Sequence, residues 1–391
     1  MINDIITKQK CTGCSVCSAV CPTSCITMEV DKLGYLFPNT EASNCTECKK
    51  CIKVCPSLDE TLLSVPKPRQ IAIAAISKDN ERWKESTSGG GFTAICETFG
   101  DDETIVYGAK FDGLKVIHDY VEGVGSISAF RRSKYVHSYV RPELYSEIKN
   151  FVESGRKVIF SGVSCQVAAV KKRLGKEYQN LLCIDIICMG SGSPTVFQSY
   201  IDELSALNKS KIKSYSFRNK RERLGRMEEY NVEVLYENNR KSSQRADLYN
   251  TSYLSALHTM EVCSNCKYQN KNRIGDITLA DFKNRVMTFP DDKDIRTLSA
   301  IVFNTEKGQQ LLAKLQEKMF CRDVDLSVIE KNVIPFGRNI KENTNRIKFI
   351  NELGSKNVIT LMKKYNNKRS FVMKIWGLLP EKLRYKIKTL K

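Results

Sequence analysis

Short apolar runs that fit buried strands recur along the chain beyond residue 70, and segments with a helical spacing of apolar residues lie between them. The strand-like runs occupy 71–76, 104–111, 157–162, 181–188 and 299–303. The helical patterns occupy 92–99, 166–174, 194–207 and 308–320. Strands and helices in this alternation pack in layers, so we predict an α/β or α+β core. The alternating segment 211–237 predicts further hairpins and favours a mixed sheet.

The first sixty residues follow a different pattern, which is set by cysteine rather than by hydrophobic period. Two runs, CTGCSVCSAVCP from residue 11 and CTECKKCIKVCP from residue 45, share one cysteine spacing and end at proline. Such runs are typical of two-cluster bacterial ferredoxins, in which three thiolates of a run bind one 4Fe-4S cluster and the fourth binds the other. Two ligand sets are therefore predicted: Cys11, Cys14, Cys17 and Cys55 for one cluster, and Cys45, Cys48, Cys51 and Cys21 for the second.

Zinc is the alternative metal for these thiolates. Four-thiolate zinc sites usually take their ligands from two separated CxxC pairs, so the continuous run favours iron and sulfide. Cys25 lies outside the spacing and is interpreted as a packed thiol. Because each cluster carries single electrons, two neighbouring clusters would make this module a relay.

Composition indicates the setting in which such a relay works. The chain has 391 residues, 16 cysteines and a formal net charge of +18. So many thiols indicate metal or redox chemistry in a reducing compartment, and the lack of a long apolar segment predicts a cytoplasmic protein. The positive charge favours an anionic partner, for which we expect an acidic electron carrier of the ferredoxin or flavodoxin type, or a partner redox subunit. No recognised reading surface supports nucleic-acid binding.

Four further cysteines beyond the repeat stand in distinctive positions. Cys165 and Cys188 follow strand-like runs, where α/β folds commonly gather ligands, and Cys263 and Cys266 form a CxxC pair. Their spacing alone leaves a third 4Fe-4S cluster, a zinc site and unliganded buried thiols open. The other cysteines of this part are interpreted as core thiols: Cys96, Cys183 and Cys321.

Two further segments carry chemistry of their own. The stretch STSGGG at 86–91 precedes a helical pattern, and its glycines allow backbone N–H groups to approach a phosphate at the helix start; a flexible turn is the alternative. The run RRSKYVHS at 131–138 adds positive charge and an aromatic ring suited to stacking on a cofactor, with a solvated basic face as the alternative. The histidines at 118, 137 and 258 are too few for a histidine-based metal site and are interpreted as core or surface residues.

Taken in order, these segments resemble a known family. The set STSGGGF, VYGAKFD, RRSKYVHS, FSGVSCQVAAV, DIICMG and CSNCKYQNKNRIGDITLADF is similar to that of the beta subunits of coenzyme F420 hydrogenases and dehydrogenases. The resemblance covers about residues 1–305, including the ferredoxin module. It implies FAD and a 4Fe-4S cluster in the large domain, with electrons passing between iron-sulfur centres and an organic acceptor.

The resemblance also implies roles for individual residues. The ligands of the third cluster would be Cys165, Cys188, Cys263 and Cys266. The flavin contacts would be Ser88, Gly89, Gly90, Gly91, Lys134, Tyr135, Ser138, Ser161 and Gly162. Asp276 and Asp281 are interpreted as structural groups. One position departs from the family pattern, because Met189 follows Cys188 where relatives usually carry histidine, and the identity of the substrate is therefore left open.

Four parts are predicted along the chain: a two-cluster 4Fe-4S ferredoxin domain at 1–62, a linker at 63–70, an FAD and 4Fe-4S domain at 71–345 and a basic helical tail at 346–391. We expect an iron-sulfur flavoprotein oxidoreductase that moves electrons from a ferredoxin-type carrier through 4Fe-4S clusters to FAD and on to a small organic substrate, or in reverse. The alternative is a non-catalytic electron-transfer subunit of a larger redox complex. For the tail, peripheral contact with an anionic inner membrane surface and docking on its own domain are both open.

Overall fold

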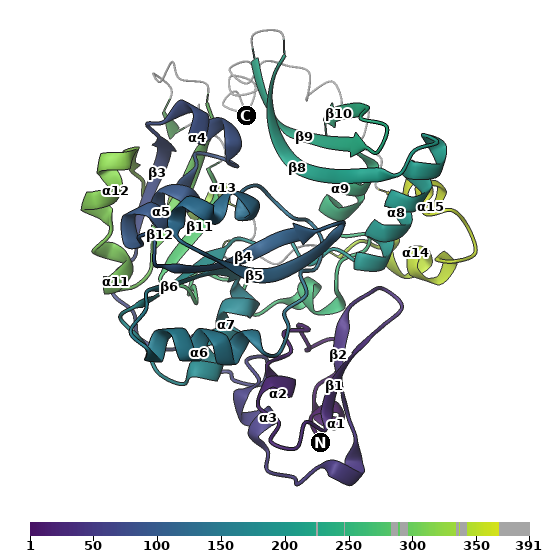
Figure 1. The fold of residues 1–391 in the computed structure, drawn as a ribbon, viewed down its shortest axis with the longest axis horizontal. Coiled ribbons are helices and arrows are strands. Elements are labelled where there is room, and N and C mark those ends of the chain that lie inside the picture. Colours follow the sequence, from purple (N-terminus) through teal and green to yellow (C-terminus); the bar gives the residue numbers. More distant parts are fainter. Residues whose placement is uncertain are drawn as a thin grey trace.

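A small N-terminal module stands at one end of the molecule (Figure 1). The computed structural model describes residues 1–223, 226–245, 247–282, 288–289, 296–333, 336 and 342–366. The module contains α1 (Ile2–Ile5), α2 (Val16–Ala19), β1 (Ile26–Val30), β2 (Leu36–Thr40), η1 (Ala42–Asn44) and α3 (Lys50–Val54), with β1 and β2 paired antiparallel. Its buried core consists of isoleucine and cysteine: Ile2, Ile6, Cys11, Cys17, Cys25, Ile26 and Cys55. A domain this small has too little apolar volume to be stable alone, so metal bound by the cysteines is expected to contribute to its folding.

The large domain is built on an eight-stranded mixed sheet. The strand order is β13-β3-β12-β11-β7-β6-β4-β5, and the central pairs β11/β7, β7/β6 and β6/β4 are parallel while the others are antiparallel. The strands are β3 (Ile71–Ser77), β4 (Ile105–Asp112), β5 (Lys115–Glu122), β6 (Val158–Val163), β7 (Leu181–Ile186), β11 (Ile277–Phe282), β12 (Leu298–Phe303) and β13 (Met319–Asp323). The expected mixed-sheet fold class is confirmed, as are the five strand-like runs.

Helices cover both faces of this sheet. They are α4 (Asn80–Glu85), α5 (Gly91–Phe99), η2 (Val124–Phe130), α6 (Leu144–Glu153), α7 (Ser164–Leu174), α11 (Glu306–Gln309), α12 (Leu312–Lys318) and α13 (Leu326–Asn332). Alternate residues of each strand point to opposite faces, so Val106 packs with α5 and α12 whereas Ile105 packs with α6 and α7. The single helix expected at 308–320 is wrong at its end, because Met319 starts β13 and pairs with β3.

A second lobe, to the right in Figure 1, surrounds a three-stranded antiparallel sheet. Its elements are α8 (Pro194–Leu207), β8 (Ile212–Arg223), β9 (Arg226–Tyr236), β10 (Lys241–Arg245), α9 (Leu248–Leu254), η3 (Glu261–Asn265), α14 (Arg346–Glu352) and α15 (Val358–Tyr365). Phe349, Leu361 and Met362 of the last two helices lie in the core of this lobe. The rest of the predicted tail, 367–391, lies outside the described residues. Among the helices that are described, none has the length and apolar run needed to cross a bilayer.

The module and the large domain are joined by buried polar contacts. The Tyr35 hydroxyl donates to the carbonyl oxygens of Ser191 and His258, both at 2.8 Å. The Ser193 hydroxyl, at the start of α8, donates to the Leu33 carbonyl at 2.6 Å. Side chains of Leu33 and Tyr35 belong to the core of the second lobe. The module is therefore held in a defined orientation rather than tethered by its linker alone.

His258 at this junction predicts a pH dependence of stability. Its ring is fully buried against Tyr249, and Nε2 lies 2.9 Å from the Ser252 hydroxyl. Burial lowers the pKa of His258 from 6.5 to about 3. Between these two pH values the imidazole is protonated in the unfolded chain but stays neutral in the folded chain, so acidification favours unfolding. Lowering the pH from 7 to 5 should therefore reduce the free energy of unfolding by about 2 kcal/mol through this residue.

Urea unfolding at the two pH values checks this expectation. His258→Gln removes the titrating ring, so the variant should lose about 2 kcal/mol less than the wild type on acidification. Equal losses in both proteins would contradict the assignment.

Candidate functional site

The first predicted ligand set of the module lies at its boundary with the large domain. Cys11, Cys17 and Cys55 are buried and Cys14 is half-buried. Burial raises the pKa of the Cys11 thiol to about 12 and that of Cys14 to about 11, and negative charge on neighbouring thiols of the set acts in the same direction. Thiols in this state need a bound cation to become thiolates. The donor set therefore fits an iron-sulfur cluster.

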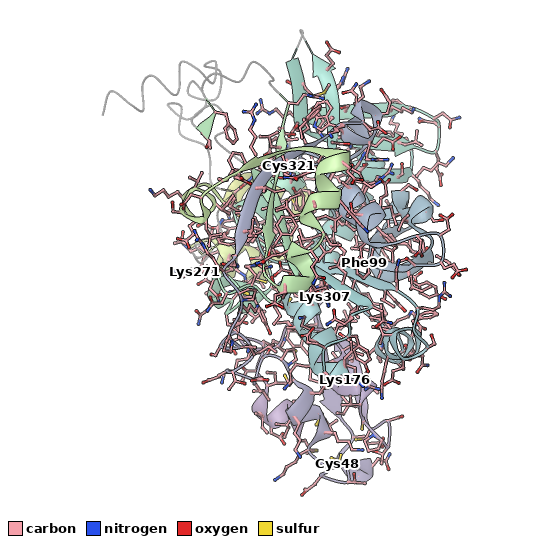
Figure 2. The ribbon with its side chains drawn as sticks, turned by 90° about the vertical axis from the view of Figure 1, so that its left-hand side faces the viewer. Cys48, Phe99, Lys176, Lys271, Lys307 and Cys321 are labelled. Carbon is pink, nitrogen blue, oxygen red and sulfur yellow. The ribbon has the colours of Figure 1, made fainter. Side chains whose placement is uncertain are left out.

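The second predicted set lies nearer to solvent. Cys48 is exposed, and Figure 2 shows it at the end of the module remote from the large domain. Burial raises the pKa of Cys51, and the charges of Cys48 and Cys21 raise it further, so these three thiols are neighbours. The Cys25 sulfur lies 3.3 Å from that of Cys21 inside the module core. The two sets thus occupy different depths, one accessible from outside and one against the large domain.

The topology brings Cys165, Cys188, Cys263 and Cys266 together around one cavity. Cys165 stands in the first turn of α7, directly after β6, and Cys188 follows β7. Since β6 and β7 are parallel neighbours, their ends meet at one edge of the sheet. Burial, followed by the charges of the other three thiols and of Cys14, raises the pKa of Cys165 well above its ordinary value. In the described part of the chain, no three Cys, His, Asp or Glu side chains have the arrangement of a single-ion site.

Two tyrosines lie where the inner module set meets these cysteines. Tyr145 is buried, donates its hydroxyl to the Cys14 carbonyl, and feels the charges of both Cys14 and Cys165. Tyr268 donates its hydroxyl to the Pro56 carbonyl at 3.3 Å and is likewise close to Cys14 and Cys165. Cys14 of the inner module set therefore lies close to Cys165 of the cavity set.

The cavity extends from these cysteines to the glycine-rich stretch and has a volume of about 320 Å³. Eight of the nine residues implied as flavin contacts line it: Ser88, Gly90, Gly91, Lys134, Tyr135, Ser138, Ser161 and Gly162. Gly89 does not line it. Thr12 of the module also reaches the wall. A concave site with a few convergent polar groups is typical of cofactor binding.

The glycine-rich stretch is tightly fitted to the sheet. A Cβ at Gly89 would lie 2.0 Å from the Ala75 carbonyl oxygen, so only glycine fits. The Ser299 hydroxyl accepts hydrogen bonds from the Gly89 and Gly91 N–H groups at 3.0 and 3.3 Å. The Ser88 hydroxyl bonds the Asp281 carboxylate. The stretch is therefore an ordered turn at the start of α5, and two of its N–H groups already have an internal acceptor.

The 131–138 segment forms another part of the cavity wall. The Lys134 ammonium donates to the carbonyls of Ala129 and Arg131 at 2.8 and 2.7 Å. Burial, together with Arg132, lowers the pKa of Lys134 to about 7. The Tyr135 ring stacks on Tyr253 with centroids 4.8 Å apart. This wall therefore combines an aromatic surface with a buried amine.

His118 lines the cavity and forms hydrogen bonds with two other lining residues, Ser138 and Ser161. Nε2 lies 3.0 Å from the Ser161 carbonyl, which can only accept, so Nε2 carries the proton and Nδ1 accepts from the Ser138 hydroxyl at 3.0 Å. Burial lowers the pKa of His118 to about 4, which keeps the ring neutral at pH 7. In this state His118 holds the backbone at Ser161, as expected for a satisfied core histidine.

Comparison with known proteins identifies the family. A family model described as the C terminus of the coenzyme F420 hydrogenase/dehydrogenase beta subunit matches residues 155–326, and a 4Fe-4S dicluster domain model matches residues 10–58. The part of the chain from residue 155 to residue 326 belongs to the coenzyme F420 hydrogenase/dehydrogenase beta-subunit family. The dicluster module makes this family member an iron-sulfur electron-transfer protein.

The search of curated proteins finds no match to this family member. Among solved structures, the xenon-derivatised F420-reducing [NiFe] hydrogenase complex from Methanosarcina barkeri contains a chain that is 18% identical. The alignment covers 76% of this chain and 90% of that chain, with a TM-score of 0.43.

Three residues of this family member that line the cavity were missed from the sequence or given only a structural role. Arg218 lies in a basic stretch of β8 that has no motif signal. Arg273 follows the CxxC pair and is buried beside it. Asp281 was interpreted as structural, and it does hold Ser88, but it also lines the cavity. Met189, which departs from the family pattern, lines the cavity as well.

Proposed function

We propose that this family member is an iron-sulfur flavoprotein oxidoreductase that moves electrons, in either direction, between a ferredoxin-type carrier and a small organic substrate, using 4Fe-4S clusters and FAD. One observation carries this proposal: a single cavity is lined at one end by four cysteines that adjoin Cys14 of the module and at the other by a glycine-rich turn at a helix start. Both ends are needed for a site that joins iron-sulfur chemistry to an organic cofactor.

The residues fit the groups that the proposal requires. The two module sets would hold one cluster each, and Cys165, Cys188, Cys263 and Cys266 would hold a third. FAD, when bound, supplies conversion between single electrons and hydride. The ordered turn at Ser88–Gly91, the Tyr135 ring and the backbone held by His118 would orient it.

The exposed end of the module is the proposed contact for the electron partner. Cys48 is exposed, whereas Cys11 and Cys17 are buried. A carrier or a partner redox subunit that docks at this end would come close to the outer cysteine set without needing to enter the large domain. Partner subunits are in keeping with the family, whose members are named as hydrogenase and dehydrogenase subunits.

Anaerobic purification with iron, sulfide and flavin quantified on one sample tests the proposal. Three 4Fe-4S clusters and one flavin predict about twelve irons, about twelve sulfides and one FAD per chain. Zinc in place of iron would refute the relay, and a chain with a full iron content but no affinity for FAD would refute the flavin assignment.

The second candidate is a non-catalytic electron-transfer subunit of a larger redox complex, which the family relationship favours. The same preparation separates the two candidates. Reduction of a small organic acceptor by the purified chain alone, with dithionite as the electron source, supports the oxidoreductase, and a strict requirement for a partner subunit supports the second candidate.

A further inference from the structure

β8 is irregular beside the cavity. Its register against β9 shifts between Ser216 and Asn219 and again between Asn219 and Arg221. Arg218, inside this bulge, has φ 59°, a left-handed conformation that side-chain-bearing residues seldom adopt. Bulges near active sites often re-aim one side chain. Here the side chain turned inward is Arg218, which is 5% exposed and lines the cavity.

The buried guanidinium is held on several sides but retains an unused donor. Nη1 and Nη2 of Arg218 donate to the Asp281 carboxylate at 2.8 and 3.2 Å, and Nη1 lies 3.3 Å from the Tyr135 hydroxyl. The guanidinium carbon stands 4.4 Å from the centre of the Tyr230 ring. Nε is buried and has no hydrogen-bond partner among the residues that the structure describes. A buried N–H without an acceptor is costly, so an acceptor from a bound molecule is expected.

Basic side chains lie near this end of the cavity, but burial lowers the pKa of both Lys134 and Lys220 to about 7, so neither is fully charged at neutral pH. Lys134 donates only to backbone carbonyls, and Lys220 donates to the carbonyls of Trp83 and Ser88, both at 2.6 Å. Arg132 donates to the Glu85 carbonyl at 3.4 Å. None of these three side chains forms a direct ion pair with a carboxylate in the described part of the chain. Two carboxylates nevertheless act on Arg218: Asp281, which pairs with it, and the buried Glu229, which also acts on Lys220. The unused Nε donor of Arg218, rather than an excess of charge, is therefore the feature that calls for a further acceptor.

We propose that Arg218 binds a phosphate or carboxylate group of the molecule that occupies the cavity. Guanidinium matches both groups because its planar fork presents parallel N–H donors. Asp281 positions the guanidinium and, through the Ser88 hydroxyl, ties it to the turn that starts α5. This proposal rests on the function proposed above and names a recognition element for its ligand. The anionic group belongs either to the flavin or to the substrate.

Binding measurements on the full-length, anaerobically prepared chain separate the two sources. Arg218→Met is compared with Arg240→Met, a control in which the lost guanidinium also lies over a tyrosine ring, at 4.5 Å from Tyr236, but outside the cavity. If the flavin phosphates are bound, Arg218→Met weakens FAD roughly ten- to hundredfold and leaves riboflavin, which has no phosphate, unchanged. If the substrate carries the anion, FAD affinity is unchanged, and saturable binding of inorganic pyrophosphate to the flavin-loaded chain is lost.

The proposal is overturned if Arg218→Met binds FAD as the wild type does and no form shows Arg218-dependent binding of pyrophosphate. Arg218→Lys, which keeps the charge but not the fork, replaces the methionine variant if that variant does not fold, and an intermediate affinity is then expected. If the wild type binds no flavin, only the flavin assignment is refuted. Pyrophosphate binding to the flavin-free chain then still tests the role of Arg218.

Discussion

Serine in place of Cys165 is expected to lower the iron content from about twelve to about eight atoms per chain while leaving the dicluster module intact. The thiol of Cys165 is acted on by all three of the other cavity cysteines and by Cys14 of the module. Cys165 stands in the first turn of α7 and so cannot shift without moving the helix. Loss of this ligand should interrupt the only proposed route from the module to the cavity. Bound FAD should then no longer be reduced through the module.

Two measurements check this expectation, namely iron content and the rate at which a reduced ferredoxin bleaches the flavin absorbance. Cys321→Ser is the matched control, because Cys321 is a half-buried thiol on β13 that faces no other cysteine of the predicted sets. The control should retain about twelve irons and full flavin reduction. A Cys165→Ser protein that keeps about twelve irons, or that reduces FAD at the wild-type rate, contradicts a third cluster at this position.

Much of the architecture was accessible from the sequence because hydrophobic period reports burial. The run 71–76 reads as a strand buried on both faces, and β3 is the second strand of the large sheet, with both neighbours paired. Cys165 and Cys188 were placed at strand ends, and the parallel pairing of β6 and β7 brings those ends together. Cysteine spacing predicted two four-cysteine ligand sets in the module, and this assignment of ligands stays a prediction. Whether iron fills these sets stays a prediction too.

The remaining features depend on contacts that no local pattern encodes. Arg218 reaches the cavity only because β8 bulges, and its partner Asp281 is 63 residues away. The helical pattern at 308–320 continues through Met319, but pairing with β3 outweighs helix propensity there. Phe349 and Leu361 belong to a segment predicted as part of a basic tail, and they are core residues of the second lobe. In each case tertiary packing decides what the local sequence leaves open.

Methionine in place of Arg273 is expected to lower the free energy of unfolding by about 3–5 kcal/mol, because it leaves the buried Asp185 carboxylate without its cation. The two side chains are 2% and 0% exposed, and their closest atoms are 3.1 Å apart. Arg273 also donates to the Ser164 hydroxyl at 2.6 Å and to the Tyr268 carbonyl at 2.7 Å. It therefore holds the segments next to Cys165, Cys188 and Cys266, and iron bound by these cysteines should be released before the module iron.

The double variant Arg273→Met/Asp185→Asn separates charge from packing. If the uncompensated carboxylate is the main cost, adding Asp185→Asn should recover much of the lost stability in urea unfolding at pH 7, although it breaks the pair from both sides. Arg156, a half-buried arginine that pairs with the exposed Glu122, supplies the control: Arg156→Met should change stability by less than about 1 kcal/mol. The contrary outcome is a double variant that is less stable than Arg273→Met. It would show that packing around the guanidinium, rather than buried charge, keeps these three cysteine-bearing segments together.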